Sequence, residues 1–354
     1  MTNLLDSIST HFDNKLPFVI YRKPNDNTIF SFLMQETDLR FVSNFEEVGF
    51  VFAPFSSIEK AIIFPVERAL IISEEWTADV YKEKEVVFNT DNTGKEEYLK
   101  IVEKAIEQIR LGHLKKVVIS REELLKVPDF NLIEVYKKLL RTYKNAFVYA
   151  WFHPKVGLWL GATPETLLSI ENTSFTTMSL AGTQLHTEHK KATWKSKELA
   201  EQQLVTTYIE KQLEQVATAL EVDKTETVKA GNLLHLRTKV SGSLKHSASL
   251  KELIGVLHPT PAVCGLPREA SRSFILKNEV YERRFYTGFL GELNVQHEKS
   301  SMPKTVLFVN LRCMKINDNY SASLFIGGGI TEDSNAEKEW EETISKSKTM
   351  KCVL

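Results

Sequence analysis

Short apolar runs separated by polar turns are the feature that most limits the fold of this chain. Between Phe18 and Ile72 they recur as FVIYRK, TIFSFLM, VGFVFAPF, KAIIFP and ALIIS, with turn signals such as PNDN at residues 24–27 between them. Runs of this length and composition predict antiparallel β-strands. No run reaches about 18 apolar residues, the length that predicts a membrane-spanning helix.

The apolar spacing changes after a polar stretch near residues 89–97. A helical period then begins at Tyr98 and ends near Gly112, with Ile101, Val102 and Ala105 on the same face. This change is the only candidate boundary, and it separates a β-rich part, residues 1–96, from residues 97–354. The early strands could nevertheless belong to the same sheets as the later ones.

Charge and cysteine content exclude several classes of protein. The 354 residues include 45 basic and 46 acidic side chains, so no net field favours nucleic acid or an anionic membrane. Cys264, Cys313 and Cys352 lie far apart and form no CxxC pair, which argues against a zinc knuckle or a disulfide framework. The N-terminus carries acids where a signal peptide would be basic, so we expect a cytoplasmic protein.

The segment after residue 323 combines groups that bind anions and cations. Gly327–Gly329 follow the apolar run SLFI, which predicts a strand ending in a loop whose backbone N–H groups face a ligand. Ser334 and Glu337 then match a capping box at the start of a helix.

On that helix, Glu339, Glu342 and Lys346 fall at i, i+3 and i+7 and share one face. Such a face could hold a divalent metal together with a substrate carboxylate. The alternative interpretation is a solvated charged face beside a core-facing Trp340.

Two lysines stand at the entrance of the apolar strand HLKKVVISR. Alternation places Lys116 on one face with Val118 and Ser120, and Lys115 on the other, so one of the two is expected to be partly buried. A lysine that accepts protons needs its pKa lowered from about 10.4 towards roughly 7–8, which an apolar environment can supply. Two lysines whose ends reach solvent remain the alternative.

Several other polar residues occupy positions that fit either a functional site or a solvated surface. Glu165 follows a proline turn, where an acid is usually solvated. Glu201 lies on the buried side of a helix predicted for residues 195–220, with Val216 and Leu220 in its apolar stripe, unless it belongs to a frayed helix start. His186 and His189 lie in Lys-rich chain without an HExxH pattern and are interpreted as surface residues.

Two further segments complete the set. The loop HPTPAVCGLP, residues 258–267, is long, rigid and uncharged, a type that is often functional. Arg312 is expected at the end of a strand over residues 305–313.

A set of motifs, taken in order along the chain, resembles the chorismate-utilising enzymes, and most closely the isochorismate synthases. The motifs are KVVISR, GATPETLL, LAGT, KELAEQQLV, HPTPAVCGLP, FYTGFLGEL, LRC, GGGI and EWEETISK. The resemblance extends from about Glu97 to the end of the sequence. It implies an α+β fold, a single large domain of antiparallel β-sheets packed with helices. Residues 1–96 would be its variable N-terminal part and residues 97–354 its chorismate-binding catalytic core.

Isochorismate synthases add water to C2 of chorismate while the C4 hydroxyl leaves, using Mg²⁺. The resemblance implies that Lys116 is the general base and Glu165 the general acid. Around the metal it implies Glu201 and Glu342, with Glu198 and Glu339 as outer partners. The implied substrate-binding residues are His258, Arg312, Lys346, Gly327, Gly328, Gly329, Ala181, Gly182 and Thr183.

Related activities are weighed on the same residues. Aminodeoxychorismate synthases carry a lysine before Gly-Thr, where Ala181 stands here. Anthranilate synthase large subunits, which usually use a glutaminase partner, carry proline and isoleucine where this chain has Ser179 and Leu180. We therefore expect no obligatory glutaminase. Salicylate synthases share the lysine and glutamates and stay an alternative, as does a non-catalytic chorismate-binding protein.

Gln202 stands where a histidine is common in the family, which could change metal affinity. The downstream pathway, menaquinone, siderophore or salicylate, stays open.

Overall fold

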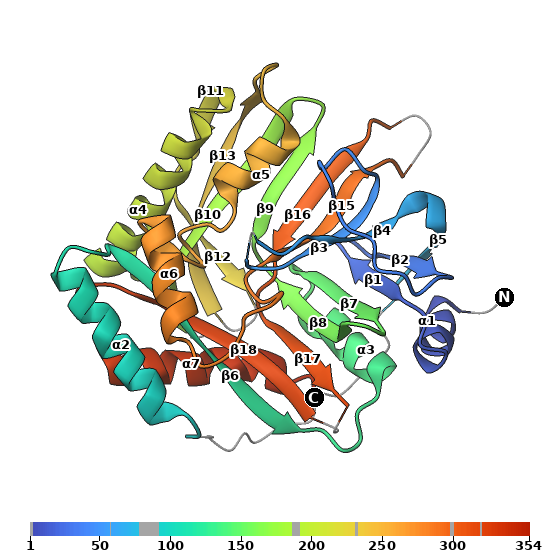
Figure 1. The fold of residues 1–354 in the computed structure, drawn as a ribbon, viewed down its shortest axis with the longest axis horizontal. Coiled ribbons are helices and arrows are strands. Elements are labelled where there is room, and N and C mark those ends of the chain that lie inside the picture. Colours follow the sequence, from blue (N-terminus) through green and yellow to red (C-terminus); the bar gives the residue numbers. More distant parts are fainter. Residues whose placement is uncertain are drawn as a thin grey trace.

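Two large antiparallel sheets pack face to face in the computed structural model, with helices on their outer sides (Figure 1). The structure describes residues 3–56, 58–77, 92–185, 192–230, 233–297, 301–318 and 321–354. In these ranges, no helix has both the length and the apolar character required to cross a membrane.

Each sheet joins strands from distant parts of the chain. In spatial order, the first sheet contains β14 (Gly265–Leu266), β6 (Lys116–Lys126), β18 (Ser321–Ile330), β17 (Cys313–Asn317), β8 (Gly157–Thr163), β7 (Phe147–His153), β1 (Phe18–Arg22), β2 (Thr28–Met34) and β5 (Ala69–Glu75). The second contains β11 (Ala217–Val222), β13 (Leu233–Leu244), β10 (Ser174–Leu185), β9 (Thr166–Glu171), β16 (Lys304–Val309), β15 (Phe289–Val295), β3 (Gly49–Ala53) and β4 (Ile62–Pro65), while β12 (Glu226–Ala230) also pairs with β13.

The five strands predicted before residue 76 are confirmed, and they divide between the two sheets. Strand β1 pairs with β7, and β3 pairs with β15. The described strands before residue 76 thus share both sheets with the rest of the chain, and the boundary at residue 96 stays a prediction.

The helices cover the outer sides of the sheets. They are α1 (Leu4–Asp13), α2 (Lys95–Arg110), α3 (Leu132–Thr142), α4 (Ser196–Leu213), α5 (Leu250–Leu257), α6 (Arg268–Asn278) and α7 (Ala336–Lys351), with a short 3₁₀ turn at Val66–Arg68. Helices α1 and α3 pack on the first sheet near β1 and β7, and α7 packs on β18. Helix α4 packs on β10 and β13 of the second sheet, with α5 beside it.

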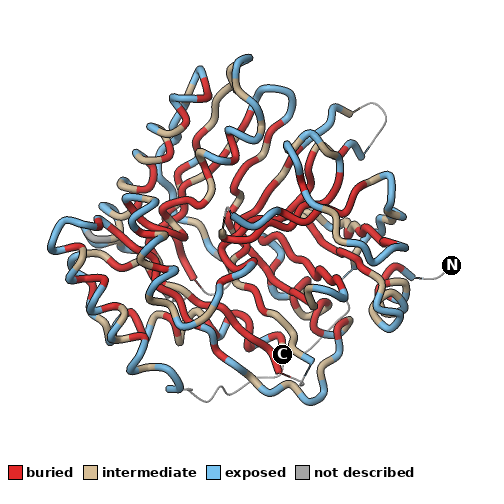
Figure 2. Tube along the Cα trace, in the orientation of Figure 1, coloured by how far each residue is buried: buried red, intermediate tan, exposed pale blue. Residues whose placement is uncertain are grey.

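Strand β1 shows how both faces of the first sheet are buried. Phe18 and Ile20 contact the apolar side chains of α1 and α3, whereas Val19 and Tyr21 point into an aromatic core between the sheets. Burial is accordingly concentrated in the strands, and the outer sides of the helices stay exposed (Figure 2). Each large apolar side chain buried there stabilises the fold by about 1.5–3 kcal/mol.

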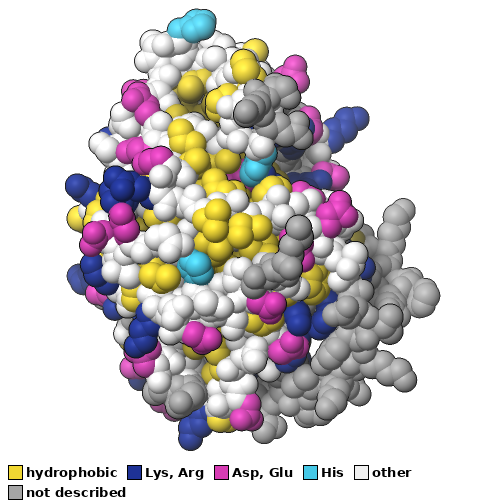
Figure 3. Space-filling model, turned by 90° about the vertical axis from the view of Figure 1, so that its right-hand side faces the viewer, with side chains coloured by type: hydrophobic (Ala, Val, Ile, Leu, Met, Phe, Trp, Pro, Cys, Tyr) yellow, Lys and Arg dark blue, Asp and Glu magenta, His cyan; other side chains and the backbone are white. Residues whose placement is uncertain are grey.

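The surface in Figure 3 mixes acidic, basic and hydrophobic side chains, with a group of hydrophobic ones near its centre. No patch of a single charge sign dominates this view, as expected from the nearly balanced charge.

Three local expectations about α4, β18 and the start of α7 are wrong. Helix α4 ends at Leu213, and β11 begins at Ala217 because its backbone pairs with β13, so Val216 and Leu220 lie outside the helix. Gly327–Gly329 are part of β18 rather than a loop, because Val118–Ser120 of β6 pair with them.

The third concerns the start of α7. Its N-cap is Asn335, whose side chain accepts a hydrogen bond from the Lys338 N–H. The Ser334 hydroxyl instead accepts from the N–H of Thr331 and closes the preceding turn. The predicted helix itself is confirmed.

Candidate active site

A cavity lies between β6 and β18 of the first sheet, β10 and β13 of the second, and helices α4 and α7. All but one of the site residues predicted from the sequence line it. These are Lys116, Glu165, Ala181, Gly182, Thr183, Glu198, Glu201, Arg312, Gly327, Gly328, Gly329, Glu339, Glu342 and Lys346. They come from elements that are up to 230 positions apart in sequence, so the fold alone brings them together.

Lys116 begins β6 and reaches the cavity from inside the sheet. Its side chain is 1% exposed, and its Nζ lies 2.8 Å from Glu201 Oε1 on α4. Its carbonyl accepts a hydrogen bond from Ser271 Oγ at 3.1 Å. Lys115 is exposed. The structure therefore shows that Lys116 is the buried lysine, which strand alternation alone could not decide.

Glu165 lies in the short link between β8 and β9 and is 2% exposed. The link is held because Val309 N donates to the Glu165 carbonyl at 3.0 Å. Burial raises the pKa of Glu165 to about 8, although the positive charges of Lys116 and Arg312 act in the opposite direction. At neutral pH this carboxyl is therefore mainly protonated, in contrast with an ordinary glutamate.

Four carboxylates face the cavity from two helices, Glu198 and Glu201 on α4 and Glu339 and Glu342 on α7. Glu342 pairs with Lys346 at 2.7 Å, and the same Nζ donates to the Gly327 carbonyl at 2.9 Å. Trp340 and Thr343 face the core, whereas Glu339, Glu342 and Lys346 share the face of α7 that lines the cavity, as the helical spacing predicts.

These carboxylates have the chemistry of a magnesium site. Mg²⁺ takes hard oxygen ligands and usually keeps waters and substrate oxygens beside one or two carboxylates. Within the described part of the chain, no three His, Cys, Asp or Glu side chains lie close enough to hold a metal by themselves. A few carboxylates on two helices that line one cavity nevertheless fit an ion that completes its ligand set with substrate and water.

The glycines of β18 leave room for side chains that cross the strand. A Cβ on Gly329 would lie 2.8 Å from Glu201 Oε1 and 3.1 Å from Lys116 Cε. A Cβ on Gly327 would lie 2.8 Å from the Tyr286 hydroxyl. This part of β18 thus forms a wall without side chains against which the Lys116–Glu201 pair lies, and a side chain at Gly329 would displace that pair.

Arg312 lies in the link between β16 and β17, with a left-handed φ of 46°, rather than at the end of a strand. Burial lowers its pKa to about 10. Its guanidinium donates a hydrogen bond to His235 Nε2, and His235 Nδ1 lies 3.0 Å from the Gly182 carbonyl. Burial lowers the pKa of His235 well below its usual value, so the ring is neutral and donates from Nδ1 to that carbonyl.

Sequence reasoning missed His235. The residue lies in β13 opposite the LAGT segment, and the only signal in the sequence was a histidine among the leucines of the run LLHL. That segment bulges between Ala181 and Thr183, where Gly182 has a φ of 67°. The bulge turns the Gly182 carbonyl towards His235.

His258 does not line the cavity. Its Nε2 lies 3.1 Å from the Thr287 carbonyl, and its ring packs edge-on against Phe289. Burial lowers its pKa to about 4. The loop that contains it contributes Ala262 and Val263 to the wall instead.

Gln202 also points away from the cavity. Its amide donates to Ser179 Oγ at 2.8 Å and to Thr238 Oγ1 at 2.9 Å, within the second sheet. His186 and His189 lie outside the described residues.

Comparison with known proteins gives consistent matches. The family model described as chorismate binding enzyme matches residues 54–354. Isochorismate synthase DhbC of Bacillus subtilis is 30% identical over 273 residues, which cover 72% of this chain and 67% of that protein. Isochorismate synthase MenF of the same organism is 30% identical over 285 residues, 77% of this chain but 58% of that protein.

A crystal structure described as a putative 2,3-dihydroxybenzoate-specific isochorismate synthase, DhbC from Bacillus anthracis, superimposes with a TM-score of 0.80. It is 25% identical in sequence, and the match covers 99% of both chains. The predicted α+β fold of antiparallel sheets and helices is thereby confirmed.

Proposed function

We propose that this chain, which belongs to the family of chorismate binding enzymes, is an isomerase that converts chorismate to isochorismate. The observation that carries the proposal is that one cavity is lined by both Lys116 and Glu165. Lys116 is a buried candidate for the base, and Glu165 is a carboxyl that keeps its proton at neutral pH. Moving a hydroxyl between two ring carbons needs one group that accepts a proton and one group that donates a proton.

The proposed reaction adds a water oxygen to C2 and expels the C4 hydroxyl, with the ring double bond moving between them. Lys116 takes a proton from the attacking water. Glu165 gives its proton to the departing C4 oxygen, which leaves as water. One water enters and one leaves, so substrate and product have the same composition. Each proton transfer is expected to contribute about 10²–10⁴-fold to the rate.

Lys116 accepts a proton only as the neutral amine, so its ion pair with Glu201 has to open in the working enzyme. Glu201 and Glu342 would hold Mg²⁺, with Glu198 and Glu339 behind them, and the bound ion would supply positive charge opposite a substrate carboxylate.

Cations and backbone groups would orient the substrate. Chorismate carries two carboxylates, which need positively charged partners. Besides Lys116, the proposed base, the cavity wall contains Arg312 and Lys346, which would bind these carboxylates. The neutral His235 holds the Arg312 guanidinium, and Lys346 is held by Glu342 and the Gly327 carbonyl. Both cations are thus pre-oriented, which lowers the entropy cost of binding.

Product analysis tests the proposal. Purified protein is incubated with chorismate and Mg²⁺, with and without ammonium, and the products are separated and weighed by mass spectrometry. A product of unchanged mass and new retention time is expected. Salicylate with pyruvate would make the protein a lyase, an aminated product would make it an ammonia-using synthase, and binding without turnover would leave a non-catalytic chorismate-binding protein.

A further inference from the structure

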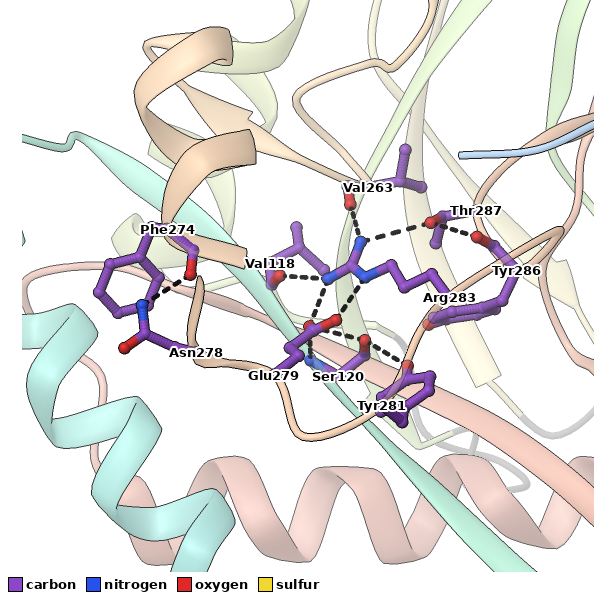
Figure 4. Close-up of polar contacts among 10 residues, drawn as sticks. All are labelled: Val118, Ser120, Val263, Phe274, Asn278, Glu279, Tyr281, Arg283, Tyr286 and Thr287. Atoms are coloured by element: carbon purple, nitrogen blue, oxygen red, sulfur yellow. Dashed lines mark hydrogen bonds and ion pairs between the residues drawn. The ribbon is translucent and has the colours of Figure 1, made fainter. Parts of the chain in front are cut away.

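A buried ion pair lies behind the cavity and has no part in the mechanism above. Glu279 follows α6, and Arg283 lies four residues later (Figure 4). Both side chains are 2% exposed. Two bonds join them, Nη2 to Oε1 at 2.6 Å and Nε to Oε2 at 2.7 Å. Such a bidentate pair is geometrically specific, and breaking a buried pair leaves an uncompensated charge.

The pair occupies the place of a missing strand at the edge of β6. Strand β18 pairs with one edge of β6 along its length. On the other edge, the two residues of β14 pair only with Lys116 and Val117. Beyond them, Arg283 Nη2 donates to the Val118 carbonyl at 2.7 Å, and Ser120 N donates to Glu279 Oε1 at 2.8 Å (Figure 4).

Glu279 contacts β6 through a second group as well. Ser120 Oγ donates to Glu279 Oε1 at 2.8 Å and lies 2.7 Å from the Tyr281 hydroxyl. The Val118 carbonyl and the Ser120 N–H, two and four residues after Lys116, are therefore satisfied by side chains of one short segment, while the Val118 N–H donates to the Cys264 carbonyl at 2.9 Å. Buried backbone groups that lack such partners are costly.

The same guanidinium reaches two more parts of the cavity wall. Arg283 Nη1 donates to the Val263 carbonyl at 2.9 Å and to Thr287 Oγ1 at 3.3 Å. Val263 and Thr287 both line the cavity. Arg283 thus touches both cavity-lining segments and β6, whereas Glu279 accepts hydrogen bonds only from Ser120 and Arg283 among the contacts in Figure 4.

We propose that Glu279 and Arg283 are a positioning pair for Lys116: they hold the backbone of β6 so that the lysine Nζ stays aimed into the cavity. This inference rests on the proposed function. Because Glu279 does not reach the cavity wall directly, its loss should act on turnover more than on substrate binding. A displacement of about 1 Å at a catalytic group is enough to cost about 10²-fold in rate.

Glu279→Gln is the decisive variant, because the amide keeps the shape but opposes an N–H donor to Arg283. The matched control is Glu292→Gln. Glu292 is also a buried carboxylate, 2% exposed, and pairs with Lys23 at 2.8 Å and His297 at 2.8 Å, away from the cavity.

Kinetics and amide hydrogen exchange are measured on the parent, Glu279→Gln and Glu292→Gln. Glu279→Gln is expected to lower kcat about tenfold or more, to leave KM within about twofold, and to speed exchange of the Ser120 amide about tenfold. Glu292→Gln should change neither readout, even if it lowers the melting temperature equally.

Unchanged kcat in folded Glu279→Gln, or an equal fall in Glu292→Gln, would overturn the inference. If Glu279→Gln does not fold, Ser120→Ala decides: a fall in kcat of about threefold at constant KM supports the positioning role, and parent-like kcat refutes it. A parent protein that does not convert chorismate would refute the proposed function instead, and Ser120 exchange would then decide whether the pair holds β6.

Discussion

Replacing Glu165 by glutamine should make the protein more stable at alkaline pH. Burial raises the pKa of this carboxyl from 4.5 to about 8 in the folded state. At 1.36 kcal/mol per pKa unit, the difference corresponds to about 5 kcal/mol. Because the folded pKa is the higher one, the unfolded chain loses its proton first, and the free energy of unfolding falls as pH rises from 4.5 through 8.

Glutamine keeps the shape of the protonated carboxyl and cannot ionise. Between about pH 5 and about pH 9, the parent should therefore lose about 4 kcal/mol of unfolding free energy relative to Glu165→Gln. Urea unfolding of both proteins at a series of pH values measures this difference. If the two proteins show parallel pH dependence, Glu165 does not have a raised pKa and the assignment of its protonated state is refuted.

The same titration predicts the pH dependence of catalysis. Above about pH 8, Glu165 gives up its proton to solvent and can no longer protonate the leaving hydroxyl, so kcat of the parent should fall. Glu165→Gln should be slower by about 10²–10⁴-fold and should lack that alkaline fall. A glutamine variant with the parent's rate would show that another group is the acid.

Lys116→Met should lower turnover by about 10²–10⁴-fold while calorimetry still detects chorismate binding; parent-like turnover would exclude Lys116 as the base. Chelation with EDTA should abolish turnover, and added Mg²⁺ should restore it. Glu201→Gln or Glu342→Gln should raise the half-saturating Mg²⁺ concentration about tenfold or more. Turnover that does not depend on metal would contradict both expectations. Gly329→Ala should lower turnover, because its Cβ would lie 2.8 Å from Glu201 Oε1 and displace that carboxylate from its place beside Lys116. The control Gly255→Ala, in the interior of α5 with no atom near the added Cβ, should instead stabilise it by about 0.5–1 kcal/mol in thermal unfolding; equal activity of both alanine variants would refute the close-approach argument.

Local patterns predicted the elements well where one face or both faces of a strand or helix are buried. Short apolar runs between polar turns located β1 and β2, and the helical period located α2 and the face of α7 that lines the cavity. These signals are local because each depends on the burial of side chains that are neighbours in sequence.

The parts that could not be predicted depend on distant partners. The choice of Lys116 over Lys115 follows from the pairing of β6 with β18 and β14. His235 acquires its place through Arg312, 77 positions away, and Ser120 acquires its partner through Glu279, 159 positions away. No periodicity within one element carries such information.

The pairing of β6 with β18 also sets an order for synthesis of the protein. Val117 lies opposite Ile330, so β6 lacks this partner until β18 has been synthesised. The cavity around Lys116 is complete only when Lys346 and its neighbours on α7 have left the ribosome. A nascent chain that stops before residue 321 therefore exposes a long, unpaired strand edge on β6. Such edges promote association between chains. Truncated chains of this protein should aggregate rather than retain partial activity, and co-translational folding must protect β6 until the last tenth of the chain arrives.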